Sequence, residues 1–130
     1  MRSGADISLI SYGIMINQAL KAAEELSRQG ISAEVIKLSA IKPAAFEKCM
    51  QSLAKTGKLI VVEDCCSAGC VGEKLAAAAV KKNITLNGLE LLNLGEGIIA
   101  HGKPDELMAD YGVDAAAIVS AAKRLVLKDK

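Results

Sequence analysis

The chain has 130 residues and a mass of 13.5 kDa, which suits a single domain. Hydrophobic residues make up 52%, and 16 basic residues are balanced by 15 acidic ones. This composition excludes a disordered chain and a basic nucleic-acid-binding surface, and no hydrophobic run reaches the ~20 residues of a membrane span. Because no signal peptide is recognisable, we expect a cytoplasmic protein with no nucleic-acid or membrane partner.

Hydrophobic residues alternate between short runs typical of strands and longer runs at helical spacing. In chain order, the first half predicts a strand at 7–12, a helix from about Ile16 to Gly30, a strand at 33–38 and a helix that starts at Pro43 and ends at Gly57. The second half predicts a strand at 59–62, a helix from about Val71, a strand at 89–94, a short helix from Pro104 to Gly112 and a last helix capped by Asp114.

This alternation indicates crossover units around a parallel sheet. Right-handed crossovers favour an α/β fold: a three-layer α/β/α sandwich with a mainly parallel sheet of four to five strands and core order 2-1-3-4. We expect one domain over residues 1–130. A ligand or partner is expected at the carboxyl ends of strands one and three, where the order reverses. The segments 12–13, 39–40, 63–72 and 95–102 border this crevice.

The four cysteines do not follow a metal-binding pattern. Cys49 stands alone, whereas Cys65, Cys66 and Cys70 lie close together, and the one histidine is far away at position 101. Zinc and iron–sulfur sites usually need four ligands, often in paired CxxC motifs. A disulfide framework is not expected in a reducing compartment. We therefore interpret the cysteines as small packing residues and predict no metal site.

Gly69 and Gly72 precede a predicted helix, whose free N–H groups would favour a phosphate. The segment matches neither GxGxxG nor GxxxxGK[ST], and ordinary turn chemistry explains its glycines better. Glu63 and Asp64 end a strand, so their side chains should point to opposite faces rather than form an acid–base pair. One of them could still cap the next turn or reach across a subunit boundary.

An imidazole is a common general base, but no serine or cysteine nucleophile lies at a diagnostic spacing from His101. A structural or interface role for His101 is the preferred interpretation. The sequence thus predicts no catalytic, cofactor-binding or metal-binding residue. It leaves one candidate interface or anion site, made of Glu63, Asp64, Gly69, Gly72 and His101.

Five segments in order resemble the transketolase C-terminal domain family. They are 6–13 (DISLISYG), 19–26 (ALKAAEEL), 30–36 (GISAEVI), 41–43 (IKP) and 55–64 (KTGKLIVVED), and the resemblance covers nearly the whole chain. Within this family, the segments 101–102, 105–107 and 111–114 look most like 1-deoxy-D-xylulose-5-phosphate synthases. Cys65 and Cys70 depart from the commoner EEHxxxGGxG pattern, because they replace its histidine and its second glycine.

The resemblance implies a transferase that uses thiamine diphosphate and Mg²⁺ to join pyruvate to glyceraldehyde 3-phosphate with loss of carbon dioxide, for isoprenoid and thiamine synthesis. In that family the cofactor-binding motif and the activating glutamate lie in other domains. The resemblance therefore implies a C-terminal domain that is inactive alone and stabilises a homodimer. Its expected partner is the upstream domains or a subunit of the same enzyme.

Three alternatives stay open at this point. The chain could be the C-terminal part of a split transketolase, part of a 2-oxo acid dehydrogenase β subunit, or a free-standing α/β module that binds an anion or a partner. Family members usually add an antiparallel edge strand from the preceding linker. Residues 1–5 are too short to supply it, so an exposed sheet edge is expected.

Overall fold

The computed structural model describes residues 1–42 and 46–127. Its elements are β1 (Ile7–Ser11), the 3₁₀ turn η1 (Gly13–Met15), α1 (Ile16–Arg28), β2 (Ala33–Lys37), α2 (Glu47–Thr56), β3 (Lys58–Val62), α3 (Val71–Lys81), β4 (Gly88–Leu92), α4 (Pro104–Asp110) and α5 (Ala115–Leu127). In this part of the chain the sheet has four parallel strands in the order β2-β1-β3-β4. The predicted order is confirmed.

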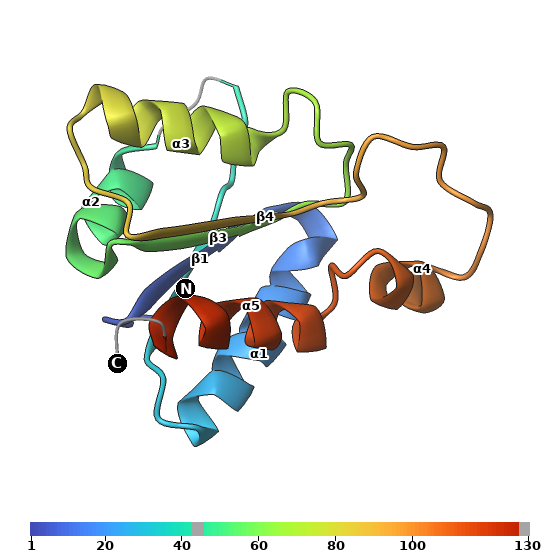
Figure 1. Cartoon of the computed structure of the whole chain (residues 1–130), viewed down its shortest axis with the longest axis horizontal. Coiled ribbons are helices and arrows are strands. Elements are labelled where there is room, and N and C mark those ends of the chain that lie inside the picture. The colour runs from blue at the N-terminus through green and yellow to red at the C-terminus, as the bar shows by residue number, and fades with distance from the viewer. Residues whose placement is uncertain (43–45, 128–130) are drawn as a thin grey trace.

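Helices cover both faces of the sheet, α1 and α5 on one and α2 and α3 on the other (Figure 1). Successive strand residues supply the two faces in turn. Leu9 belongs to the core cluster of α1 and α5, whereas its neighbour Ile10 belongs to that of α2 and α3. All five residues of the central strand β1 are buried, as expected for a parallel strand covered on both sides. The predicted three-layer α/β/α fold is therefore confirmed.

Local sequence explains where several elements begin and end. Gly57 has φ +65° and ends α2, and Asp114 caps α5 because its Oδ1 accepts the Ala117 N–H at 2.8 Å. The predicted start of α2 at Pro43 lies outside the described residues. The last strand runs over 88–92 rather than 89–94, because the Asn93 side chain accepts the Gly95 N–H at 3.0 Å and turns the chain out of the sheet.

Residues 1–5 form no edge strand, as predicted, but they pair with β2 in one antiparallel bridge, so the predicted exposed edge is partly covered. Arg2 and Val35 exchange two backbone hydrogen bonds, of 3.2 and 2.9 Å, in an antiparallel bridge. A side chain at Gly4 would lie 2.2 Å from the Ala33 carbonyl carbon, so glycine permits this close approach. Residues 1–5 thus cover the middle of the β2 edge.

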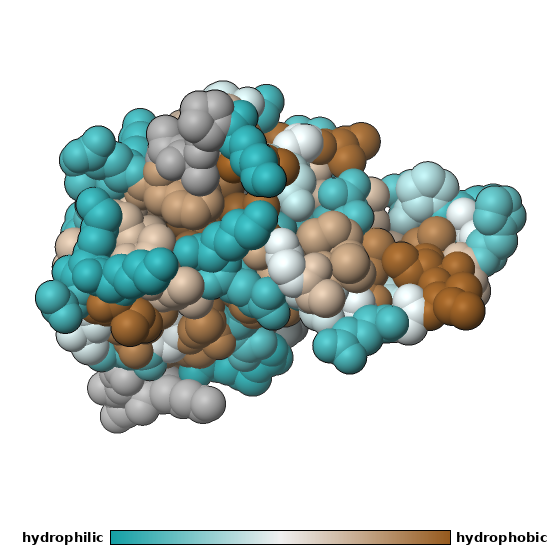
Figure 2. Space-filling view, turned by 90° about the horizontal axis from the view of Figure 1, so that it is seen from above, coloured by the Kyte–Doolittle hydropathy of each residue, from teal (hydrophilic) through white to brown (hydrophobic). Residues whose placement is uncertain are grey.

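Residues 95–112, which we call the arm, leave the body after β4 and carry α4 (Figure 1). Gly95 and Gly112, with φ of +74° and +66°, stand at its two ends. None of the residues of α4 is buried. Figure 2 shows the arm as a lobe that projects from the body and carries hydrophobic surface. Among the described residues, no helix is long and apolar enough to cross a bilayer.

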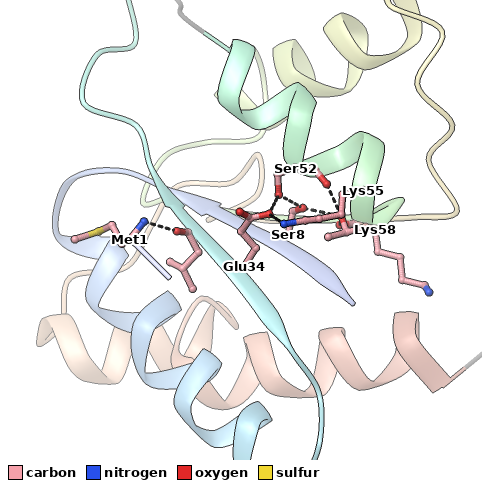
Figure 3. A network of polar contacts seen from close by, with 8 residues as sticks. Met1, Ser8, Glu34, Ser52, Lys55 and Lys58 are labelled. Carbon is pink, nitrogen blue, oxygen red and sulfur yellow. Dashed lines mark hydrogen bonds and ion pairs between the residues drawn. The ribbon is translucent and has the colours of Figure 1, made fainter. Parts of the chain in front are cut away.

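A group of buried hydroxyls, which we call the amino-end cluster, ties α2 to the amino ends of β1 and β2 (Figure 3). Ser8 Oγ lies 2.6 Å from Ser52 Oγ and 2.7 Å from Thr56 Oγ1. Ser52 also donates to Glu34 Oε2 at 2.6 Å, and the Lys55 ammonium lies 2.6 Å from the same oxygen. Every buried side-chain nitrogen and oxygen of the described residues has a hydrogen-bond partner.

Candidate functional site

Glu63 follows β3 at the carboxyl end of the sheet, and its side chain is buried, with 1% of the residue exposed. Its Oε1 accepts the N–H of Val71 at 2.8 Å, and its Oε2 accepts the N–H of Gly72 at 2.9 Å. The Tyr12 hydroxyl, from the end of β1, donates to Oε1 at 2.9 Å. Three donors from two neighbouring segments therefore converge on one carboxylate, and we call this group, with Cys65, the carboxyl-end cluster.

The position of Glu63 explains how a buried carboxylate is tolerated without a cation. Val71 and Gly72 are the first two residues of α3, so their N–H groups have no partner within the helix. The positive end of the helix dipole favours a negative charge there. The residue at the usual capping position, Cys70, makes no side-chain capping bond, and Glu63 supplies the acceptor instead.

Gly72 allows α3 to approach the sheet closely enough for this contact. A Cβ atom at this position would lie 2.5 Å from Leu91 Cδ2, 3.3 Å from Val61 Cβ and 3.2 Å from Glu63 Oε2. Glycine is needed here for space, whereas Gly69 has open space around it but a φ of +71°. The Gly69 N–H donates to Glu73 Oε2 at 3.0 Å.

These contacts bear directly on the predicted anion site at Gly69 and Gly72. A phosphate at a helix N-terminus is held by the free N–H groups of the first turn. Here the Glu63 carboxylate occupies the N–H groups of Val71 and Gly72. The anion site stays a prediction. The geometry favours the carboxylate of Glu63, a residue of the same chain, as the negative group that these N–H groups bind.

The other side chains of the cluster are held in their protonated forms. Burial, followed by the hydrogen bond to Glu63, raises the pKa of the Tyr12 hydroxyl well above its usual value near 10. Burial also raises the pKa of Cys65, whose Sγ lies 3.7 Å from Glu63 Oε1, and that of Cys70. A raised pKa disfavours the thiolate, so neither cysteine is an activated nucleophile.

The cysteines differ in burial, and this corrects part of the sequence prediction. All four are free, and Cys49 and Cys70 are buried packing residues as expected. Cys66 is exposed, because the turn after β3 carries its thiol outward, with Sγ 3.8 Å from the carbonyl oxygen of Ala68. Among the described residues, no group of three or more His, Cys, Asp or Glu could hold a metal ion.

The structure separates the remaining candidate residues from Glu63. Asp64 is exposed, in agreement with the prediction that the two neighbouring acids point to opposite faces. His101 is exposed on the arm before α4, and no hydrogen bond described for this part of the chain joins it to the carboxyl-end cluster. The structure thus joins Glu63 directly to Gly72, while Gly69 contacts Glu73 and Asp64 and His101 remain surface residues.

Sequence reasoning missed the part that Tyr12 and the buried serines play. The sequence places Tyr12 beside the crevice, but its hydrogen bond to Glu63 joins residues 51 positions apart. Ser8 and Ser11 lie in a strand that is buried throughout. Because a buried hydroxyl needs a hydrogen-bond partner, serines in such a strand are a signal of polar contacts in the core. Ser11 Oγ donates to the Val62 carbonyl at 2.7 Å across the β1–β3 pair.

The chain matches the family model described as "Transketolase, C-terminal domain" over residues 1–118. It is 38% identical over 124 residues to the 1-deoxy-D-xylulose-5-phosphate synthase of Desulforudis audaxviator, which covers 95% of this chain and 19% of that protein. It is 36% identical over 104 residues to the pyruvate dehydrogenase E1 component subunit beta of Bacillus subtilis, which covers 80% of this chain and 30% of that subunit.

A solved structure shares the fold. It is described as "Split gene transketolase, inactive beta4 tetramer", and it matches with a TM-score of 0.88 and 24% identity over 99% of this chain and 42% of that chain. The synthase of Gloeothece citriformis, at 30% identity, is matched over 98% of this chain and 20% of its own length. The chain thus spans about a fifth of the length of the synthases it matches.

Proposed function

The chain belongs to the transketolase C-terminal domain family, and from this premise we propose that it is the C-terminal domain of a 1-deoxy-D-xylulose-5-phosphate synthase. The whole enzyme would be a cytoplasmic, homodimeric transferase that joins pyruvate to glyceraldehyde 3-phosphate with loss of carbon dioxide. Identities of 30–38% to such synthases over 95–98% of this chain support the choice within the family. Resemblance to a pyruvate dehydrogenase subunit keeps the dehydrogenase alternative as the second candidate.

The observation that carries a structural role for this domain is the position of Glu63. In doubly wound folds, the crevice where strand order reverses is the usual ligand site. Here that position, between β1 and β3, contains the buried carboxylate of Glu63, held by Tyr12 and by the first turn of α3. The chain thus fills its own crevice with a carboxylate that is hydrogen-bonded to one side chain and to two backbone N–H groups.

The described residues do not fit thiamine diphosphate and its magnesium ion. The helix N–H groups of Val71 and Gly72 that would suit a diphosphate are bonded to Glu63. Within the described ranges, no cluster of carboxylate, imidazole or thiol side chains could hold the ion. The proposal therefore assigns the cofactor to polypeptide outside this chain, and to this domain the work of buttressing that polypeptide and the dimer.

An exchange experiment tests the proposal. The segment of the Desulforudis audaxviator synthase that matches this chain is replaced by this chain, and turnover of pyruvate and glyceraldehyde 3-phosphate is measured. We expect the chimera to retain activity and the enzyme truncated before that segment to lose it. An inactive chimera that is folded and binds cofactor would contradict the proposal.

Calorimetry on the chain alone separates the proposal from a free-standing anion-binding module. We expect no heat of binding when thiamine diphosphate with Mg²⁺, or glyceraldehyde 3-phosphate, is titrated into the chain. Tight binding of either would overturn the structural role, because it would place the ligand site within these residues.

A further inference from the structure

The arm presents two neighbouring isoleucines to solvent. Ile98 is 100% exposed and Ile99 is 40% exposed. None of the other exposed large hydrophobic residues of the described chain has another as its neighbour in sequence, and single residues of this kind are normal on protein surfaces: Met1, Ile14, Ile41, Val80, Leu89 and Leu127. Figure 2 shows hydrophobic surface on the projecting lobe that the arm forms. Ile98 and Ile99 are therefore the one pair of adjacent exposed large hydrophobic residues in the described chain.

The arm is fixed at its base although it buries little of its own surface. Met108 of α4 packs on the core beneath α1 and α5, and Gln18 Nε2 of α1 lies 3.6 Å from its sulfur. The Val113 N–H donates to the Met108 carbonyl at 2.9 Å, where the arm rejoins the body. The arm is thus anchored at α4, while its preceding loop holds the isoleucines away from the core.

The charges of the arm indicate what kind of surface it would contact. It carries one lysine, Lys103, and four acidic residues, which are Glu96, Asp105, Glu106 and Asp110. A symmetric contact between two arms would place acidic residues opposite each other, which is unfavourable. A surface that is apolar at its centre and basic around it would complement both features of the arm.

We propose that the arm is a docking surface for the larger, cofactor-binding part of the synthase, onto an apolar patch surrounded by basic residues. This inference rests on the proposed function. The chain is about a fifth of the length of the synthases that it matches, so most of such an enzyme lies outside it.

The test supplies this chain in trans to the Desulforudis audaxviator synthase truncated before the matching segment. Restored turnover is measured against the concentration of added chain, which gives a half-saturating concentration. The combined variant Ile98→Ser and Ile99→Ser should raise that concentration roughly tenfold or more, because buried anchors dominate interfaces of this kind. Raising the salt concentration should weaken wild-type docking as well.

Val80→Ser is the matched control, because Val80 is 70% exposed and lies on α3, away from the arm. It should leave the half-saturating concentration unchanged, and both variants should melt at the wild-type temperature when alone. Equal effects of the arm variant and the control would overturn the docking proposal, and so would failure to restore activity in trans beside an active covalent chimera. An inactive covalent chimera would instead overturn the proposed function, and the docking proposal with it.

Discussion

The two polar clusters at opposite ends of the sheet hold a carboxylate in different ways. Glu63, at the carboxyl end, accepts two helix N–H groups and the Tyr12 hydroxyl, whereas Glu34, at the amino end, is held by Ser52 and by an ion pair with Lys55. Backbone donors at the start of a helix cannot turn away. The Lys55 side chain is 45% exposed, so its ammonium can return to water.

This difference shows at which end of the sheet the polar contacts are held more firmly. The end of the sheet that holds ligands in many doubly wound proteins is sealed here by donors that belong to the fold itself. The amino end, which has no such role, carries the weaker and more exposed pair. The comparison predicts that disturbing Glu63 costs much more stability than disturbing the Glu34–Lys55 pair.

The largest expected effect is therefore that of Glu63→Ala. It removes the acceptor of two buried N–H groups, on Val71 and Gly72, and of the half-buried Tyr12 hydroxyl, and it should lower the free energy of unfolding by about 3 kcal/mol. Glu63→Gln keeps one carbonyl acceptor but turns an NH₂ group toward one of the donors, so it should cost about 1–2 kcal/mol. Urea unfolding measures both losses.

Asp64→Ala is the matched control, because Asp64 is the exposed neighbour of Glu63. It should change stability by less than about 0.5 kcal/mol. A loss for Glu63→Ala as small as that of the control would show that the carboxyl-end cluster does not hold α3 on the sheet.

Gly72→Ala is expected to have the second largest effect. It tests whether α3 must lie close to the sheet for its first turn to contact Glu63. The added methyl group would lie 2.5 Å from Leu91 Cδ2, which can rotate, and 3.2 Å from Glu63 Oε2, which is fixed by its hydrogen bonds. Overpacking of this kind costs about 1–3 kcal/mol, and the better helix propensity of alanine offsets up to about 1 kcal/mol of it. A net loss of about 1 kcal/mol should follow in thermal or urea unfolding.

Gly97→Ala provides the comparison for this prediction. Gly97 lies on the arm, has no positive φ, and no atom lies within 4 Å of a Cβ built there. Its substitution should be close to neutral. If Gly72→Ala proved as neutral as Gly97→Ala, the contact between α3 and the end of β3 would be looser than described.

The fold was predictable from the sequence because its signals are local and repeated. Short hydrophobic runs alternate with helical spacing, and residues such as Gly57 and Asp114 mark helix ends by their own chemistry. These features, with the handedness of crossovers, are enough for the strand order.

The candidate site was predictable only in part, because its contacts join distant parts of the chain. The position of Glu63 after a strand indicated the crevice and left open that one of the two acids caps the next turn, but it did not indicate that the acceptor would be Glu63 and the donors the first turn of α3, eight residues further on. The hydrogen bonds of Glu63 with Tyr12 and of Ser8 with Ser52 join residues 51 and 44 positions apart. The pairing of Arg2 with Val35 likewise depends on a close approach of two backbone segments, which no single sequence motif predicts.

The smallest expected effect concerns acid stability at the amino end. Burial raises the pKa of Glu34, but the hydrogen bonds from Lys55 and Ser52 outweigh it, so the net pKa lies below the usual value. A carboxyl group whose pKa is lower in the folded state stabilises the fold above its unfolded pKa of about 4.3, and the contribution is lost as the pH falls below that value. Lys55→Met should remove this contribution while keeping the apolar part of the side chain. Since Lys55 is half exposed, the loss at pH 7 should be only about 0.5 kcal/mol.

Urea unfolding of both proteins at pH 7 and at pH 3 measures this difference, and the other carboxylates cancel in the comparison. The gap between wild type and Lys55→Met should narrow as the pH falls toward 3, because protonation of Glu34 removes the ion pair, and it should also narrow with added salt at pH 7. A gap that persists unchanged at pH 3 would mean that Lys55 stabilises the fold through packing. In that case the contrast between Glu63, which backbone donors hold in place, and Glu34, which pairs with an exposed lysine, would no longer explain how the two ends of the sheet differ.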